Sequence, residues 1–433
     1  MRKLSLQTID FPLLAATVLL VTMGILCIYS SGVTSQGVMV SREYIKQIIW
    51  AATGLVILVF FAFLDYNALR SYSVYIYGAG LLLLLITPLV GKPVNGSRSW
   101  IGIGELGIQP SEFAKISTIL FLASYFSGIG KGIRELPRFL LGLLFVCIPV
   151  GLILLQPDMG TAISYLPVFL FMAFMAGAEP RHLVFCFSFG MLTFTLAAIP
   201  SLQGATPKGL AALLVNGTFT RVLLLAGTGI TGLAFLGYRT LKQRYFYWIF
   251  YASLILFLSF ACSLALRSLL KDYQLMRLVI FVNPQLDPKG AGWNILQSIT
   301  AIGSGGFPGK GFLKGTQSHL RFLPQQSTDF IFSILAEEWG LLGGILVLAL
   351  FAVIILRGMG IAYESKDDFA MFTGCGIVTM YFFHVLVNVG MAMGIMPVTG
   401  IPLLFLSYGG SSLWTAMTGV GILMNIRGRR IRN

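Results

Sequence analysis

The sequence predicts an all-α polytopic membrane protein with about twelve transmembrane helices. Of its 433 residues, 56% are hydrophobic and only 11% are charged, and the mean hydropathy is +0.85. The apolar residues fall into blocks of roughly 18 to 25, the length that a helix needs to cross about 30 Å of hydrocarbon. Continuous blocks favour helices over a β-barrel, because in lipid each backbone group must be hydrogen-bonded within its segment.

The apolar blocks predict the spans in order along the chain. Their bounds are 11–30, 47–64, 73–90, 111–129, 138–155, 159–177, 183–201, 220–238, 245–267, 329–356, 369–395 and 401–425. The first block is too long for a cleaved signal peptide, and we expect it to stay as a span. Between Ser268 and Thr328, about sixty residues are rich in glycine and polar groups and predict one long loop outside the membrane.

Lysine and arginine fix the expected orientation. Most of those in the short connections fall on the segments that share a side with the N-terminus, and this bias predicts cytoplasmic termini and an extracytoplasmic loop at 268–328. The net charge of +14 therefore reflects the orientation of the chain in the membrane and does not indicate nucleic-acid binding. The basic tail 427–430 is interpreted as an anchor that faces anionic lipid.

Ionisable residues in or beside a span are costly and are therefore candidates for function. Glu112 and Lys115 are spaced i,i+3, so they share a helix face and can neutralise one another. A structural ion pair and a role in holding substrate are both open for them. Asp158 follows a proline, and either a turn or N-cap role or a place in the site fits it. Arg98 could grip a phosphate or stack near Trp100.

Asp329 opens the tenth predicted span directly after the long loop. An acid is favoured in a first helical turn by the helix dipole whatever its function, so the position alone does not require chemistry. Upstream, the glycines of 301–311 allow close approach of backbone to a ligand, and Lys310 adds positive charge. Without the strand-to-helix setting of a P-loop, this glycine-rich run is a weak phosphate signal. No ligand set for a metal is visible, since the chain has three histidines and no clustered Cys/His.

These segments together resemble the SEDS family of shape, elongation, division and sporulation proteins, and its elongation branch more than its division branch. The resemblance rests on motifs in the same order along most of the chain: Q-P-S-E-F-A-K (109–115), Q-P-D-M-G-T (156–161), D-Y-Q (272–274), N-P-Q-L-D-P-K-G-A-G-W (283–293), Q-S-I-T-A-I-G-S-G-G (297–306), G-K-G-F-L-K-G-T-Q-S (309–318), T-D-F-I-F (328–332) and P-L-L-F-L-S-Y-G-G-S (402–411). Members of the family usually have ten spans, so residues 202–268 are expected to add a helix pair to one membrane domain.

The resemblance implies a peptidoglycan glycosyltransferase that polymerises lipid II at the outer face of the cytoplasmic membrane during cell elongation. It makes Asp329 the essential acid. The substrate-binding candidates on the motifs and nearby are Lys115, Glu112, Arg98, Asp158, Lys310, Gln317 and Ser407. A divalent cation such as Mg²⁺ could assist. The implied partners are lipid II, the growing glycan strand and a class B penicillin-binding protein, alongside membrane lipids and no nucleic acid.

Two other functions fit parts of the pattern. A lipid II flippase or transporter would also carry intramembrane acids and bases, but near the midplane rather than gathered at one lip. A non-catalytic scaffold for a cell-wall synthase would need its spans but not every polar motif. Both alternatives predict that no glycan polymer is made.

Overall fold

The computed structural model describes residues 9–94, 97–103, 106–202, 216–269, 280–281, 284, 290–320 and 322–430. The chain divides into two compact units, one of residues 1–178 and 294–433 and one of residues 179–293. The motif residues 272–274 and most of 283–289 lie outside the described residues. The prediction of one membrane domain stays a prediction.

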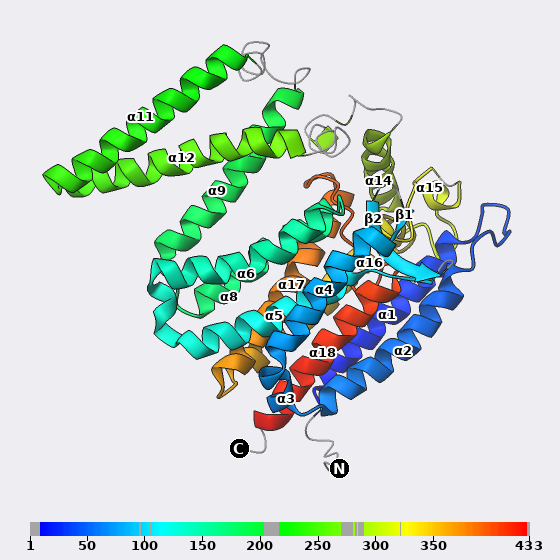
Figure 1. Ribbon diagram of the computed structural model, residues 1–433. Helices are drawn as coiled ribbons and strands as arrows, with labels where there is room; N and C mark the ends of the chain where they lie inside the picture. The colour runs from blue at the N-terminus through cyan, green and yellow to red at the C-terminus, as the bar shows by residue number, and fades with distance from the viewer. Residues whose placement is uncertain are drawn as a thin grey trace. The chain divides into compact units, whose positions relative to one another are not determined.

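The larger unit is a helical bundle with one small sheet (Figure 1). Its elements are α1 (Phe11–Ser31), α2 (Glu43–Phe63), α3 (Tyr66–Ser71), α4 (Ser73–Val90), β1 (Lys92–Val94), β2 (Ser97–Ile103), β3 (Leu106–Ile108), α5 (Pro110–Ile129), η2 (Gly130–Arg134), α6 (Leu136–Leu154), α7 (Met159–Ile163), α8 (Tyr165–Met175), α15 (Thr316–His319), α16 (Ile331–Tyr363), α17 (Asp368–Ala392) and α18 (Gly410–Arg430). Helix α14 (Ala291–Gly305) begins in the smaller unit and continues into this one.

The all-α polytopic prediction is confirmed. Among the described residues, ten helices are long and apolar enough to cross a membrane. The two remaining predicted spans are the shorter apolar stretch Met159–Met175, which is divided at Ser164 into α7 and α8, and the helix α18. The twelfth span was predicted to begin too early, because residues 401–409 form turns and irregular backbone before α18 begins at Gly410. The count of twelve stays a prediction.

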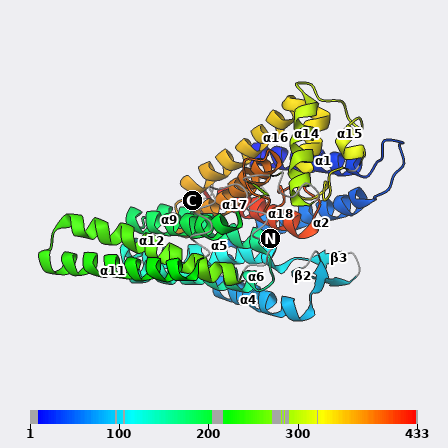
Figure 2. The same cartoon turned by 90° about the horizontal axis from the view of Figure 1, so that it is seen from above.

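Helix α17 forms the centre of the larger unit. It packs against α16, α5, α8 and α18, and most of its side chains are buried. Helix α18 lies along α2, as the red and blue ribbons show (Figures 1 and 2). Arg427 near the end of α18 and Arg357 of α16 both pair with buried Asp10, which caps α1. This cluster fixes one end of the bundle and leaves the polar motifs at the other.

Two connections contain structure that the sequence did not predict. The strands β1, β2 and β3 form a three-stranded antiparallel sheet in which Lys92 pairs with Trp100 and Ile101 with Ile108. The long polar segment also contains helices, α14 and α15. The long segment was expected to be a loop because it is rich in glycine, which is depleted in regular elements.

The smaller unit is built from three helices of the described chain. They are α9 (Pro180–Ala198), which continues into η3 (Ile199–Leu202), α11 (Gly217–Leu241) and α12 (Arg244–Leu269). Helices α11 and α12 form a hairpin in which Lys242 adopts the left-handed conformation, and α12 packs along α9. The hairpin lies where an additional pair was predicted, and its status as an addition to the family's ten spans stays a prediction.

Candidate active site

A buried ion pair lies on the first turns of α5. Pro110 occupies the start of the helix, where its missing N–H costs nothing, and the following turns bring Glu112 and Lys115 onto one face. Lys115 Nζ lies 2.8 Å from Glu112 Oε1, and both side chains are almost completely buried. The contact agrees with the i,i+3 spacing. The ammonium of Lys115 has two further N–H groups that need hydrogen-bond acceptors.

His384 of α17 accepts the second of these N–H groups. Its Nε2 lies 2.9 Å from Lys115 Nζ, and its Nδ1 lies 3.0 Å from the carbonyl oxygen of Pro402. A carbonyl can only accept, so Nδ1 carries a proton and donates it, and Nε2 can then accept from Lys115 only in a neutral ring. Lys115 therefore donates to one anion and one neutral ring, and keeps a third N–H.

Asp329 is half-buried and is held through its backbone. Its N–H donates to the carbonyl of Gln325 at 3.1 Å, and its carbonyl accepts from Asn388 Nδ2 of α17 at 3.0 Å. The preceding carbonyl, of Thr328, accepts from Ser407 Oγ at 2.6 Å. Helix α16 begins at Ile331 with Phe330 in the N-cap position, so the carboxylate lies one residue before the cap.

Two residues of α17 link the ion pair to this aspartate. His384 and Asn388 are four residues apart and share one face of the helix, about one turn of 5.4 Å from each other. His384 contacts Lys115, and Asn388 donates both to Asp329 and, at 2.8 Å, to the carbonyl of Ile401. One buried helix face thus positions both predicted groups.

Asp158 caps a helix. Its Oδ1 accepts from the backbone N–H of Thr161 at 3.1 Å, and its Oδ2 accepts from the Thr161 hydroxyl and from Gln109 Nε2, each at 2.8 Å. The backbone N–H of Gln109 donates to Ser411 Oγ at 2.9 Å. The starts of α5, α7 and α18 therefore meet at one end of the bundle, as the predicted topology required.

Ser407 is buried, and its hydroxyl is used by backbone groups. It donates to Thr328 and accepts from the N–H of Leu403 at 2.9 Å. The next residue, Tyr408, donates its N–H to the carbonyl of Ser327 at 2.8 Å. The irregular segment after α17 therefore holds the residues just before Asp329 in place through hydrogen bonds to their backbone.

Lys310 and Gln317 surround a second buried acid, Glu337 of α16. Glu337 Oε1 accepts from Lys310 Nζ at 2.8 Å and from the backbone N–H of Gln317 at 2.9 Å. The backbone and hydroxyl of Thr316 and Ser318 donate to the same carboxylate. A carboxyl group that accepts this many hydrogen bonds is ionised. The Glu337 carboxylate therefore neutralises Lys310, and it also caps the first turn of α15.

Arg98 lies on β2 with an exposed side chain. The hydroxyl of its neighbour Ser99 donates to the carbonyl of Gln156 at 3.2 Å, which places β2 beside the turn that leads to Asp158. Asn95 and Gly96 of the same motif lie outside the described residues. Strand β2 therefore places Arg98 close to the polar end of the bundle, but Arg98 is not part of the buried network.

The structure brings Glu112, Lys115, Asp329, Asp158 and Ser407 into one connected network, while Lys310 and Gln317 belong to the loop around Glu337. Sequence reasoning missed the residues that join them: His384, Asn388, Gln109 and Glu337. A polar residue inside an apolar span was the available signal for the two on α17. Among the described residues, no group of three His, Cys, Asp or Glu side chains is arranged to hold a metal ion, and the cation stays a prediction.

Comparisons with known proteins match the whole described bundle. The FtsW, RodA and SpoVE family model, described as "Cell cycle protein", matches residues 11–206 and 210–431. The chain belongs to this family. The peptidoglycan glycosyltransferase RodA of Treponema pallidum is 46% identical over 435 residues, which cover all of both chains. The peptidoglycan glycosyltransferase MrdB of Escherichia coli K12 is 33% identical over 96% of this chain and 93% of its own.

Solved structures of the family share the fold. One comes from a study of structural coordination of polymerization and crosslinking by a peptidoglycan synthase complex. It has a TM-score of 0.67 and 26% identity, and it covers 98% of this chain and 99% of its own. The rod shape determining protein RodA of Thermus thermophilus has a TM-score of 0.61 and 25% identity, with 98% of each chain covered. This chain is therefore a multi-pass membrane protein of the FtsW, RodA and SpoVE family.

Proposed function

We propose that this chain is a peptidoglycan glycosyltransferase that joins the disaccharide units of lipid II into glycan strands. The observation that carries the proposal is the shared face of α17, where His384 holds Lys115 and Asn388 holds the backbone of Asp329. An acid and a cation that are both held by one helix face suit a reaction that removes a proton and releases a negatively charged group. The family membership and the names of the relatives support the same activity.

Asp329 is the proposed general base. It takes the proton from a sugar hydroxyl of the acceptor while that oxygen forms a bond to the anomeric carbon of the donor. The bond from that carbon to the pyrophosphate oxygen breaks, and the lipid pyrophosphate leaves with the electron pair. Because one base acts in one direct displacement, the anomeric centre inverts. The backbone bonds that hold Asp329 limit its movement and so favour a reactive geometry.

The cations have different proposed tasks. Lys115 offers its third N–H to the pyrophosphate, and Glu112 and His384 orient the ammonium. Arg98, exposed on β2, is free of the buried network and is the second candidate for the leaving group. Lys310 is neutralised by Glu337, so we assign it, with Gln317, to shaping the loop. Asp158 and Ser407 hold backbone in place and are proposed as positioning residues.

The orientation and the partner belong to the same proposal. We place both termini in the cytoplasm and the polar end of the bundle at the outer face of the cytoplasmic membrane, on the strength of the lysine and arginine bias. A class B penicillin-binding protein is the proposed partner, since newly made strands need cross-linking. The related structure of a peptidoglycan synthase complex is consistent with such an assembly.

The test is to purify the chain, alone and with that partner, to supply lipid II, and to separate the products by size. Glycan strands are the expected product. In parallel, the protein is placed in vesicles, and the movement of lipid II between leaflets is followed. Translocation without polymer formation would replace the glycosyltransferase with a flippase, and neither activity would leave a scaffold.

A further inference from the structure

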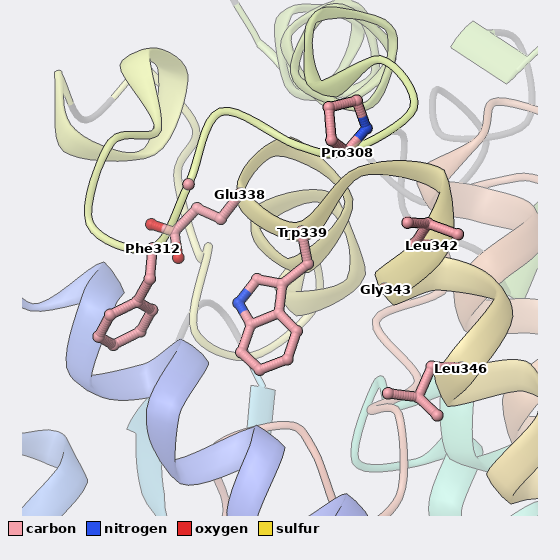
Figure 3. A pocket seen from close by; sticks show the side chains of 8 residues that line it. Pro308, Phe312, Glu338, Trp339, Leu342, Gly343 and Leu346 are labelled. Atoms are coloured by element: carbon pink, nitrogen blue, oxygen red, sulfur yellow. The ribbon is translucent and has the colours of Figure 1, made fainter.

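A pocket of about 360 Å³ lies beside α16, apart from the network around Asp329. It is lined by Pro308, Gly311, Phe312, Glu338, Trp339, Leu342, Gly343 and Leu346. Figure 3 shows the ring of Trp339 between Phe312 on one side and Leu342 and Leu346 on the other. A volume of this size is at the small end of ligand sites and accommodates one chain rather than a packed helix.

A break in α16 creates the pocket. Gly340 has φ +64° and ψ −158°, and the glycine-rich loop docks on the broken turn. The backbone N–H of Lys310 donates to the backbone carbonyl of Glu337 at 3.0 Å. The backbone N–H of Gly311 donates to the backbone carbonyl of Glu338 at 2.9 Å. Gly311 and Gly343 bring no side chains to the walls, which leaves space among the other lining residues.

Trp339 supplies a buried donor to this place. Its Nε1 is inaccessible to water and has no hydrogen-bond partner within the described chain. Figure 3 shows this nitrogen on the side of the ring turned toward Phe312 and the Glu338 carboxylate. An indole N–H can only donate, and an unmet buried donor costs about 1–3 kcal/mol, so the site is incomplete without an acceptor.

Glu338 supplies the matching acceptor. Its Oε1 is bound by the hydroxyl of Ser30 and lies 3.3 Å from His319 Nε2, while Oε2 is buried without a hydrogen-bond partner. The backbone N–H of Leu313 also lies near the carboxylate. His319 Nδ1 lies 2.7 Å from the carbonyl of Val33 and must donate to it.

Glu338 Oε2 is an acceptor both when the carboxyl is ionised and when it carries a proton on Oε1. A ligand group that satisfies the site therefore needs a donor for Oε2 and an acceptor for Trp339 Nε1. A hydroxyl provides both with one oxygen.

The remaining walls identify the rest of the ligand. Leu342 and Leu346 are about half exposed on a helix that is long and apolar enough to span a membrane, so this side faces lipid chains. Tryptophan is typical of the boundary between chains and headgroups. An apolar chain along these leucines would place its polar end at Trp339 and Glu338. The oxygens of an ionised pyrophosphate only accept hydrogen bonds, so Glu338 Oε2 would remain without a donor.

We propose that the pocket binds a membrane lipid whose headgroup carries free hydroxyls, with one hydroxyl between Trp339 Nε1 and Glu338 Oε2 and one acyl chain along Leu342 and Leu346. The proposal does not depend on the glycosyltransferase reaction, because it concerns binding alone.

The probe is phosphatidylglycerol, compared with phosphatidylethanolamine of the same acyl chains, added to the purified full-length protein and followed by native mass spectrometry. The wild type is expected to retain one phosphatidylglycerol about tenfold more tightly than the ethanolamine lipid, the difference that about 1.4 kcal/mol produces. Trp339→Phe keeps the ring but loses the N–H and is expected to abolish this preference. Leu346→Trp fills the pocket and is expected to prevent retention.

Leu356→Trp is the matched control, since Leu356 is exposed on the same helix away from the pocket and its substitution should change nothing. Melting temperatures of all variants verify folding. Equal retention of both lipids by the wild type would overturn the proposal, and so would phosphatidylglycerol binding that survives Trp339→Phe and Leu346→Trp. A preference for phosphatidylethanolamine would show that Oε2 takes an ammonium and would contradict the hydroxyl assignment.

Discussion

Asn388 Nδ2 donates to the backbone carbonyl of Asp329 at 3.0 Å, and the same amide donates to Ile401 at 2.8 Å. One buried side chain on α17 therefore ties together the residue before α16 and the irregular segment before α18. His384, one turn away, holds Lys115. The proposed base and the proposed donor cation are both positioned by one face of this helix.

Replacing Asn388 by alanine is expected to lower polymerisation about a hundredfold, the order expected when a catalytic group moves by about 1 Å. The two carbonyls also lose their partners, which costs about 1–3 kcal/mol each. The rate is measured with lipid II, and stability is measured by thermal unfolding in detergent.

Asn425→Ala provides the control. Asn425 of α18 also donates two bonds, to the carbonyls of Phe61 at 2.8 Å and Leu64 at 2.7 Å, at the opposite end of the bundle. We expect a similar loss of stability with little loss of rate. Equal rates in the two variants would show that Asn388 acts only through stability.

Variants of the Glu112–Lys115 ion pair on α5 can distinguish a structural role from a role in substrate binding. Glu112→Gln leaves a buried ammonium poorly paired and is expected to cost about 3–5 kcal/mol of unfolding free energy. The double variant Glu112→Leu with Lys115→Met removes both charges and should regain most of that stability, as thermal unfolding would record.

The double variant then tests the role of Lys115 in the folded protein. If the ammonium binds the donor pyrophosphate, the variant folds but makes glycan at less than about a hundredth of the wild-type rate, as expected for a lost group that stabilises the departing charge. Polymerisation at the wild-type rate would assign the pair to structure alone.

The docked glycine loop gives a prediction about stability. Gly309 has φ +85°, and a Cβ there would lie 2.1 Å from the carbonyl oxygen of Glu338, so Gly309→Ala combines backbone strain with a clash. We expect a loss of about 2–5 kcal/mol. Gly306 also has positive φ, at +62°, but has open space around it. Gly306→Ala should cost only about 1–2 kcal/mol. Equal melting temperatures for the two variants would mean that the loop does not dock.

Part of this architecture could be predicted from the sequence. The spans follow from apolar blocks because lipid admits few alternatives to a helix. The contact of Glu112 with Lys115 follows from helical spacing, and the cap at Asp158 follows from its place before a helix. The meeting of the polar motifs at one end follows from counting the spans.

The rest depends on tertiary contacts. His384 and Asn388 lie alone in an apolar helix, and nothing local shows which groups they reach. The break at Gly340 exists because a loop some thirty residues upstream docks there, and the sequence W-G-L-L-G-G around it is compatible with a regular helix. Ser407 donates to the carbonyl of Thr328, a contact between residues 79 positions apart, and its role in substrate binding stays a prediction.

The central claim is tested most directly by Asp329→Asn, which keeps the size of the side chain and the backbone bonds but removes the base. Asp368→Asn, at an exposed position in the first turn of α17, is the matched control. Both purified variants are supplied with lipid II, and the glycan strands are separated by length. We expect strands from the wild type and from Asp368→Asn, and none from a normally folded Asp329→Asn. Strands made by Asp329→Asn at an undiminished rate would contradict the account.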